Sequence, residues 1–138
     1  MKVKKVLRFY FYADRLEKAF DGIIYRSALG SASIAESERC AEKICGLIGE
    51  KQKLSRFWAY LDKVLCGFTQ SERSALGRYA SLRCGIKKLG DEERRAIKRA
   101  AVKFKRRARR IESFAEALGL VGKYYSLIPS ESAGYLSG

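Results

Sequence analysis

The sequence predicts an all-α fold, a compact bundle of four to five helices in which the last long helix is strongly basic. Pro129 is the only proline in 138 residues, so almost nothing in the chain forbids helix. Hydrophobic residues recur at spacings of three and four through each long segment, as they do on one face of a helix. Two of these segments also begin with a Ser/Thr-x-x-Glu capping box.

The composition predicts one domain. Hydrophobic residues make up 47% of the chain, which is enough for a single core, and no repeat or low-complexity linker divides the sequence. Residues 1–129 are therefore expected to form a single helical domain, followed by a flexible C-terminal tail over residues 130–138.

The first helix is expected over residues 3–29, with Gly30 as its C-terminal stop. Its apolar residues are Val6, Phe9, Ala13, Leu16, Phe20, Ile23 and Ile24. The four consecutive aromatic residues at 9–12 extend around too much of the helix for one buried stripe. We expect part of this cluster to be packed from two sides or to lie in an interface, and a homodimer through it is one expectation.

The second helix is expected to begin at the capping box Ser33-Ile34-Ala35-Glu36 and to run to about Cys66. One side of it carries an apolar residue every seven positions, at Cys40, Leu47, Leu54, Leu61 and Phe68. Gly46 and Gly49 weaken its middle, so a bend or a break near Gly49 is expected.

The third helix is expected to begin at a second capping box, Thr69-Gln70-Ser71-Glu72, and to end before Gly85. A short connection over residues 86–90 leads to Asp91, which is expected to be the N-cap of the fourth helix. Two glutamates follow in its first turn, where the helix dipole favours negative charge.

The fourth helix is expected to continue to about Leu118, or on to Ile128. A narrow apolar seam runs along it, formed by Ile97, Ala101, Phe104, Ala108, Ile111, Ala115 and Leu118. Because alanine lets two helix backbones approach closely, we expect this seam to pack against the second or third helix.

The segment from Arg94 to Arg110 is the most informative part of the chain. Ten of its seventeen residues are Lys or Arg, and none is acidic. With the apolar seam buried, like charges crowd the remaining surface and repel one another unless a polyanion relieves them. The predicted nucleic-acid-binding residues are Lys87, Lys88, Arg94, Arg95, Lys98, Arg99, Lys103, Lys105, Arg106, Arg107, Arg109 and Arg110.

The overall charge favours the same kind of partner. The chain has 29 Lys and Arg against 15 Asp and Glu, a formal net charge of +14. One alternative is an adaptor, small inhibitor or assembly subunit that engages an acidic or a nucleic-acid-binding protein partner. The others are an anionic membrane surface and a face kept charged for solubility. A second basic cluster, Lys2, Lys4, Lys5 and Arg8, would extend the binding surface if it shared a face with the first.

One stretch of sequence also favours DNA. Phe68-Thr69-Gln70-Ser71-Glu72-Arg73-Ser74-Ala75-Leu76, followed by Arg78-Tyr79, resembles the opening helix of the helix-turn-helix in sigma-factor region 4 and related phage late-transcription regulators. The resemblance covers residues 68–110; the Arg-Tyr pair comes one residue early, and residues 86–90 leave little room for the short middle helix. It implies that residues 91–110 form a recognition helix. Four of its early residues, Arg94, Arg95, Lys98 and Arg99, would then face the major groove.

Aromatic residues keep RNA as an alternative ligand. Those that could stack on unpaired bases are Tyr10, Tyr12, Trp58, Tyr124 and Tyr125. Packing in the core or in a dimer is the other interpretation of the same residues. Our expectation is a DNA-binding protein with a transcription-regulatory or mobile-element role.

No enzyme, metal site or cofactor is predicted. The chain has no histidine to act as a general base or metal ligand, and it has no glycine-rich phosphate loop. Four cysteines, Cys40, Cys45, Cys66 and Cys84, lack C-x-x-C spacing and are expected to be buried free thiols. Neither a signal-peptide pattern nor a run of about 18 apolar residues is present, so the reducing cytoplasm is the expected location.

Overall fold

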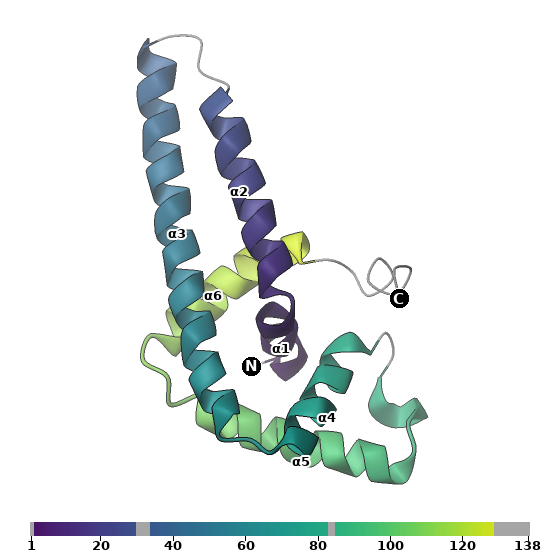
Figure 1. Cartoon of the computed structure of the whole chain (residues 1–138). Coiled ribbons are helices and arrows are strands. Elements are labelled where there is room, and N and C mark those ends of the chain that lie inside the picture. The colour runs from purple at the N-terminus through teal and green to yellow at the C-terminus, as the bar shows by residue number, and fades with distance from the viewer. Residues whose placement is uncertain (1, 30–33, 83–84, 129–138) are drawn as a thin grey trace.

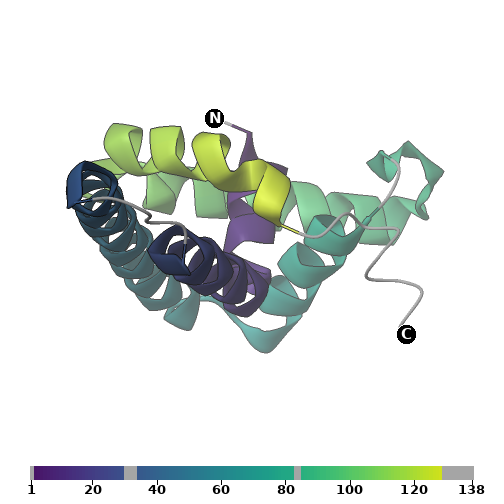
Figure 2. The ribbon, with the colours of Figure 1, turned by 90° about the horizontal axis from the view of Figure 1, so that it is seen from above.

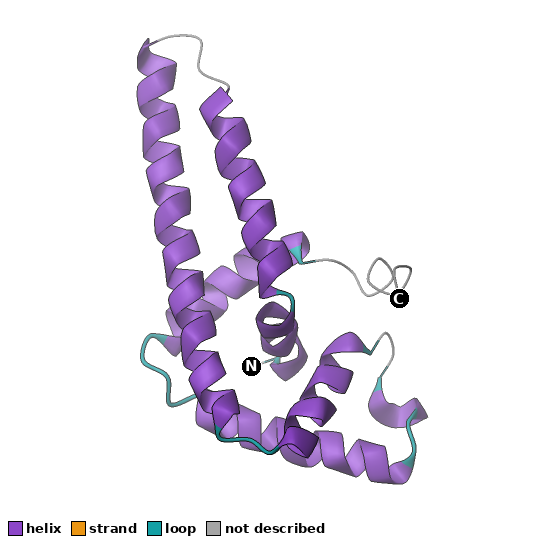
Figure 3. Cartoon of the chain, in the orientation of Figure 1, coloured by secondary structure: helices purple, strands orange, loops and turns teal. Residues whose placement is uncertain are grey.

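The computed structural model describes residues 2–29, 34–82 and 85–128, and within these ranges the chain is helical with no β-strand (Figure 3). The all-α prediction is confirmed. The elements are α1 (Val3–Phe11), α2 (Ala13–Leu29), α3 (Ile34–Cys66), α4 (Gln70–Ser81), the 3₁₀ turn η1 (Ile86–Lys88), α5 (Asp91–Ala108), α6 (Phe114–Tyr124) and the 3₁₀ turn η2 (Tyr125–Leu127). The described residues thus contain six α-helices rather than four or five.

Two parts of the molecule differ in shape. Helices α1, α5 and α6 contact α3, and α4 packs on α1 and α5, whereas α2 and the first half of α3 lie side by side and extend from this body as an antiparallel arm (Figure 1). A salt bridge of 2.7 Å between Lys51 and Asp21 joins the two helices of the arm. The predicted bundle is therefore compact only in its body.

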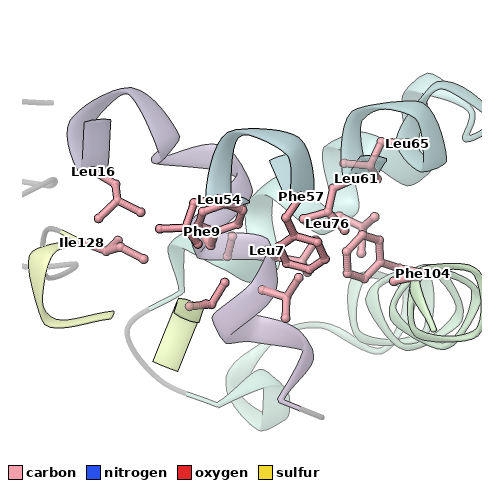
Figure 4. Close-up of a cluster of buried hydrophobic side chains, with 14 of the residues drawn as sticks. Leu7, Phe9, Leu16, Leu54, Phe57, Leu61, Leu65, Leu76, Phe104 and Ile128 are labelled. Atoms are coloured by element: carbon pink, nitrogen blue, oxygen red, sulfur yellow. The ribbon is translucent and has the colours of Figure 1, made fainter. Parts of the chain in front are cut away.

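Helix α1 lies at the centre of the body. It contacts α2, α3, α4, α5 and α6, and the view down the arm shows it between the α5–α6 side and the α2–α3 side (Figure 2). Four consecutive residues, Val6, Leu7, Arg8 and Phe9, are buried. Neighbours from the other helices surround Leu7 and Phe9, including Phe57, Leu61, Leu76 and Phe104 (Figure 4).

The aromatic run at 9–12 is packed from two sides, as expected. Phe9 stacks on Phe57 with ring centroids 5.6 Å apart, and Tyr10 stacks on Trp58 at 5.3 Å. The Tyr10 hydroxyl donates a hydrogen bond of 2.6 Å to Asp62. Burial and this bond to a carboxylate raise the pKa of Tyr10 above its ordinary value. Phe9 thus belongs to the core of a single chain, Tyr10 and Tyr12 pack against that core, and Phe11 is exposed.

Two long helices expected from the sequence are each divided. The first breaks at Tyr12, whose φ of −109° and ψ of 21° leave the helical region, and this break turns α1 into the core while α2 enters the arm. The last ends at Ala108, and after a loop with Ser113 at a left-handed φ of 59° the chain returns as α6 against α3. The basic segment is therefore not in the last helix.

Capping was predicted correctly at one site and wrongly at another. The Thr69 hydroxyl accepts a hydrogen bond of 3.1 Å from the Glu72 N–H, and Glu72 accepts one of 2.9 Å from the Thr69 N–H. The N-cap of α5 is Gly90, and Asp91 is its first helical residue. The capping box proposed at Ser33 and the proposed tail over 130–138 lie outside the described residues.

Other details of the helices also differ from expectation. Helix α3 continues through Gly49, so the chain does not break there, and of the two expected outcomes the break is wrong. Cys45 and Cys66 are free but exposed, because they lie on the outer side of α3, and Cys40 is half-buried. Cys84 lies outside the described residues. No helix in the described ranges is long and apolar enough to cross a membrane.

Candidate nucleic-acid interface

Helix α5 has two distinct faces. Ile97, Phe104 and Ala108 are buried, together with Ala100, and the helix packs chiefly against α4 and also against α3. Of the predicted seam up to Ala108, Ile97, Phe104 and Ala108 are confirmed as buried, whereas Ala101 is half-buried. The seam fails at Ala115, which is exposed because the helix has already ended. Burial of one side fixes the rotation of α5, so the opposite side must face outward.

Two of the twelve predicted cations, Lys103 and Arg107, belong to the scaffold. The Lys103 Nζ lies 2.9 Å from a carboxylate oxygen of Glu72 and 4.5 Å from the ring centroid of buried Phe68. The Arg107 guanidinium lies over the same ring at 5.3 Å and donates a hydrogen bond of 3.5 Å to the Gly67 carbonyl. Both side chains attach α5 to the junction between α3 and α4, so they are less able to meet a ligand.

Two carboxylates partner cations of α5. Hydrogen bonds from the Thr69 backbone N–H and from Lys103 hold the pKa of Glu72 below its ordinary value. Asp91 accepts a hydrogen bond of 2.5 Å from Arg94, three residues along the same helix, and Arg94 is half-buried. Arg94 is therefore the third predicted residue with a partner inside the molecule.

The remaining cations of the segment form one surface, here called the cationic face. It consists of Arg95, Lys98, Arg99, Lys105, Arg106, Arg109 and Arg110. All are exposed except half-buried Lys105, and none has a side-chain hydrogen bond or ion pair in the described part of the chain. Five of them, Arg95, Lys98, Arg99, Lys105 and Arg106, lie on α5 within an arc of about 120°, and Arg109 and Arg110 follow directly after the helix ends. The exposed carboxylates of Asp91 and Glu92 lie one turn before Arg95, so repulsion among the remaining cations has no carboxylate nearby on the helix to relieve it.

Val102 lies at the centre of the cationic face, and sequence reasoning missed it. Its side chain is 64% exposed. Positions three and four residues away on either side are Lys98, Arg99, Lys105 and Arg106, so an apolar group is surrounded by four cations. Projecting the sequence onto a helix would have found it, because Val102 is opposite the buried seam.

Lys87 and Lys88 form a separate, smaller group. They lie in η1, directly before α5, and both are exposed. Neither has a side-chain partner among residues 2–29, 34–82 and 85–128. They lie before the N-terminal end of α5, and the acidic first turn, Asp91, Glu92 and Glu93, separates them in sequence from the cationic face.

The N-terminal basic cluster does not join this surface. Arg8 is buried, only 4% exposed, and its Nη1 donates a hydrogen bond of 3.0 Å to the Ala80 carbonyl. Lys4 donates to the Leu82 carbonyl, and the Lys5 ammonium lies 4.8 Å from the ring centroid of Tyr125. The first two cations thus meet carbonyls at the C-terminal end of α4, which helix geometry leaves unsatisfied.

The described residues contain no group of three or more His, Cys, Asp or Glu side chains that could hold a metal ion. Comparison of the chain with protein-family models, with curated proteins and with solved structures finds no match. The geometry of α5 is therefore the basis on which a function can be argued.

Proposed function

We propose that this protein binds DNA through the cationic face, with α5 lying in the major groove, in a transcription-regulatory or mobile-element role. The observation that carries the proposal is the set of seven cations without partners, five on one arc of α5 and two directly after it, on the side opposite the buried face of the helix. DNA phosphates supply the missing counter-charge, and release of their condensed counterions adds a favourable free energy. The surface lies on a rigid helix, so binding needs no folding step.

Two features favour duplex DNA over RNA. The major groove of B-DNA admits an α-helix, whereas the major groove of A-form RNA is too deep and narrow for side chains to read. In the centre of the face, Val102 can contact the methyl group of thymine, which RNA lacks. The helix-turn-helix resemblance adds support, since Arg95, Lys98 and Arg99 are exposed in the first half of α5.

A titration of labelled duplex DNA, single-stranded DNA and structured RNA at several salt concentrations tests the proposal. Duplex DNA should bind most tightly, and its affinity should fall steeply as salt rises. Replacing Arg99, Arg106 and Arg109 together with Glu should reduce the affinity by at least about a hundredfold, because three phosphate contacts become repulsive.

A matched control separates this site from net charge. Lys18, Arg39 and Lys43 on the arm are also exposed cations, and replacing all three with Glu changes the net charge by the same amount. This control should retain near-native affinity. An equal loss in both triple variants would contradict a specific site on α5. Absence of binding to every nucleic acid at low salt would instead favour the acidic protein partner, captured as a complex that survives nuclease.

A further inference from the structure

A cavity lies just beyond the end of the cationic face. It is bounded by α3 on one side and, on the other, by the start of α6 and the loop before it, at the left of Figure 1. Its volume is about 330 Å³, within the range of pockets that hold small organic groups. Glu112 lines it and is two residues after Arg110, so the chain places the cavity near the C-terminal end of the proposed DNA surface.

One wall of the cavity is aromatic. Tyr60 lines it with its side chain 42% exposed, and the Lys63 ammonium lies 5.9 Å from the Tyr60 ring centroid. Phe57 also lines the cavity. Its ring packs against those of Phe9 and Phe114, with centroid distances of 5.6 and 5.9 Å. A partly exposed ring on a fixed aromatic base is a surface on which a planar group can stack.

The polar wall presents both donors and acceptors. Arg56 and Glu112 line the cavity, and neither makes a side-chain hydrogen bond or ion pair with any residue the structure describes. The other charged residues of the lining are Lys53 and Glu116, which pair at 2.8 Å, and Lys53 holds the pKa of the Glu116 carboxyl below its ordinary value. With two cations and two carboxylates the lining has no net charge, so it does not select a bare phosphate. The unpaired Arg56 guanidinium can donate hydrogen bonds and the unpaired Glu112 carboxylate can accept them, which suits the edge of a nucleobase.

We propose that this cavity takes one unpaired nucleobase of the DNA bound by α5. The base stacks on Tyr60, while Arg56 and Glu112 hydrogen-bond to its edge. This inference rests on the proposed function and makes it more specific, since the preferred ligand becomes a duplex with an unpaired nucleotide at one end. Stacking on an aromatic side chain tolerates any base, so the selectivity it creates is for the unpaired state.

The test compares a blunt DNA duplex with the same duplex carrying one unpaired 2-aminopurine nucleotide at its end. The wild-type protein should bind the second duplex about tenfold more tightly, the gain expected from one stacked base, and should quench the 2-aminopurine fluorescence. Tyr60→Ala should abolish both the preference and the quenching, whereas Tyr60→Phe should keep both because the ring remains. Arg56→Gln should reduce the ratio of the two affinities.

Tyr25→Ala is the matched control, because Tyr25 is 65% exposed but lies on the arm. Tyr25→Ala should change neither the ratio of the two affinities nor the quenching of 2-aminopurine fluorescence. Equal affinity of the wild-type protein for both duplexes, without quenching, would overturn the cavity proposal and leave DNA binding by α5 intact. Loss of binding to both duplexes at low salt would overturn the two proposals together.

Discussion

The two basic segments of this protein look alike in sequence, but the structure provides partners for the cations of one and not for those of the other. In α1, the Arg8 guanidinium is buried on the Ala80 carbonyl and Lys4 meets the Leu82 carbonyl. In α5 and directly after it, the seven cations of the cationic face have no side-chain partner in the described part of the chain. Positive charge in a sequence therefore does not by itself indicate a ligand surface. What matters is whether the fold supplies a partner for the charge.

The largest expected effect comes from removing the buried cation of α1. Arg8→Met should lower the free energy of unfolding by about 2 kcal/mol, because the Ala80 carbonyl loses a charged donor in the core. Urea denaturation measures this change. Arg99→Met, the matched substitution on the cationic face, should leave stability unchanged and weaken DNA binding. If Arg8→Met is as stable as the wild type and loses DNA affinity instead, Arg8 belongs to the ligand surface and the contrast between α1 and α5 is wrong.

A smaller loss of stability is expected where α5 is attached to α4. Lys103→Ala should lower the Tm, because it removes the 2.9 Å ion pair with Glu72 and the contact with Phe68. Lys98→Ala, five residues earlier on the exposed side, should not change the Tm. Thermal unfolding followed by circular dichroism separates the two, and equal Tm values would place Lys103 on the ligand surface after all.

The same pair predicts a pH dependence. The pKa of Glu72 is lowered in the folded state, so its contribution to stability is present above its unfolded pKa and is lost as the pH falls through its folded pKa. Glu72→Gln should therefore be less stable than the wild type at neutral pH, and the difference should shrink as the solution is acidified. A difference in unfolding free energy that stays constant with pH would show that Glu72 is not ionised in the pair.

The smallest expected effect concerns Val102. If its side chain meets a thymine methyl group, the wild type should bind a thymine duplex about fourfold more tightly than the same duplex with uracil, the value of one buried methyl group. Val102→Ala should remove this preference and leave the salt dependence unchanged. A competition titration measures the ratio, and a preference that persists in Val102→Ala would mean that another residue contacts the base.

Features set by local interactions were predictable from the sequence. The capping box at Thr69 and the buried positions of α5 as far as Ala108 depend on residues within one or two turns of helix. The break at Tyr12 and the loop that ends at Ser113 were missed. Both depend on where α1 and α6 pack, and helical periodicity gives no information about that packing.

The candidate site was predicted to a similar extent. Helical spacing was enough to indicate that most cations of residues 94–110 face outward. It could not identify Lys103 and Arg107 as part of the scaffold, since their partners Glu72 and Phe68 come from another part of the chain. The hydrogen bonds of Arg8 and Lys4 to the Ala80 and Leu82 carbonyls could not be predicted for the same reason.

Two adjacent arginines allow the most direct test of the central claim. Arg106 belongs to the cationic face, whereas Arg107 lies over Phe68 and is hydrogen-bonded to Gly67. The measurement is the salt dependence of duplex DNA affinity for Arg106→Gln and Arg107→Gln. We predict that Arg106→Gln reduces the slope of log K against log salt by about one, and that Arg107→Gln leaves the slope at its wild-type value. Equal slopes for the two variants would contradict the claim that the fold, and not charge density, selects the DNA-binding residues.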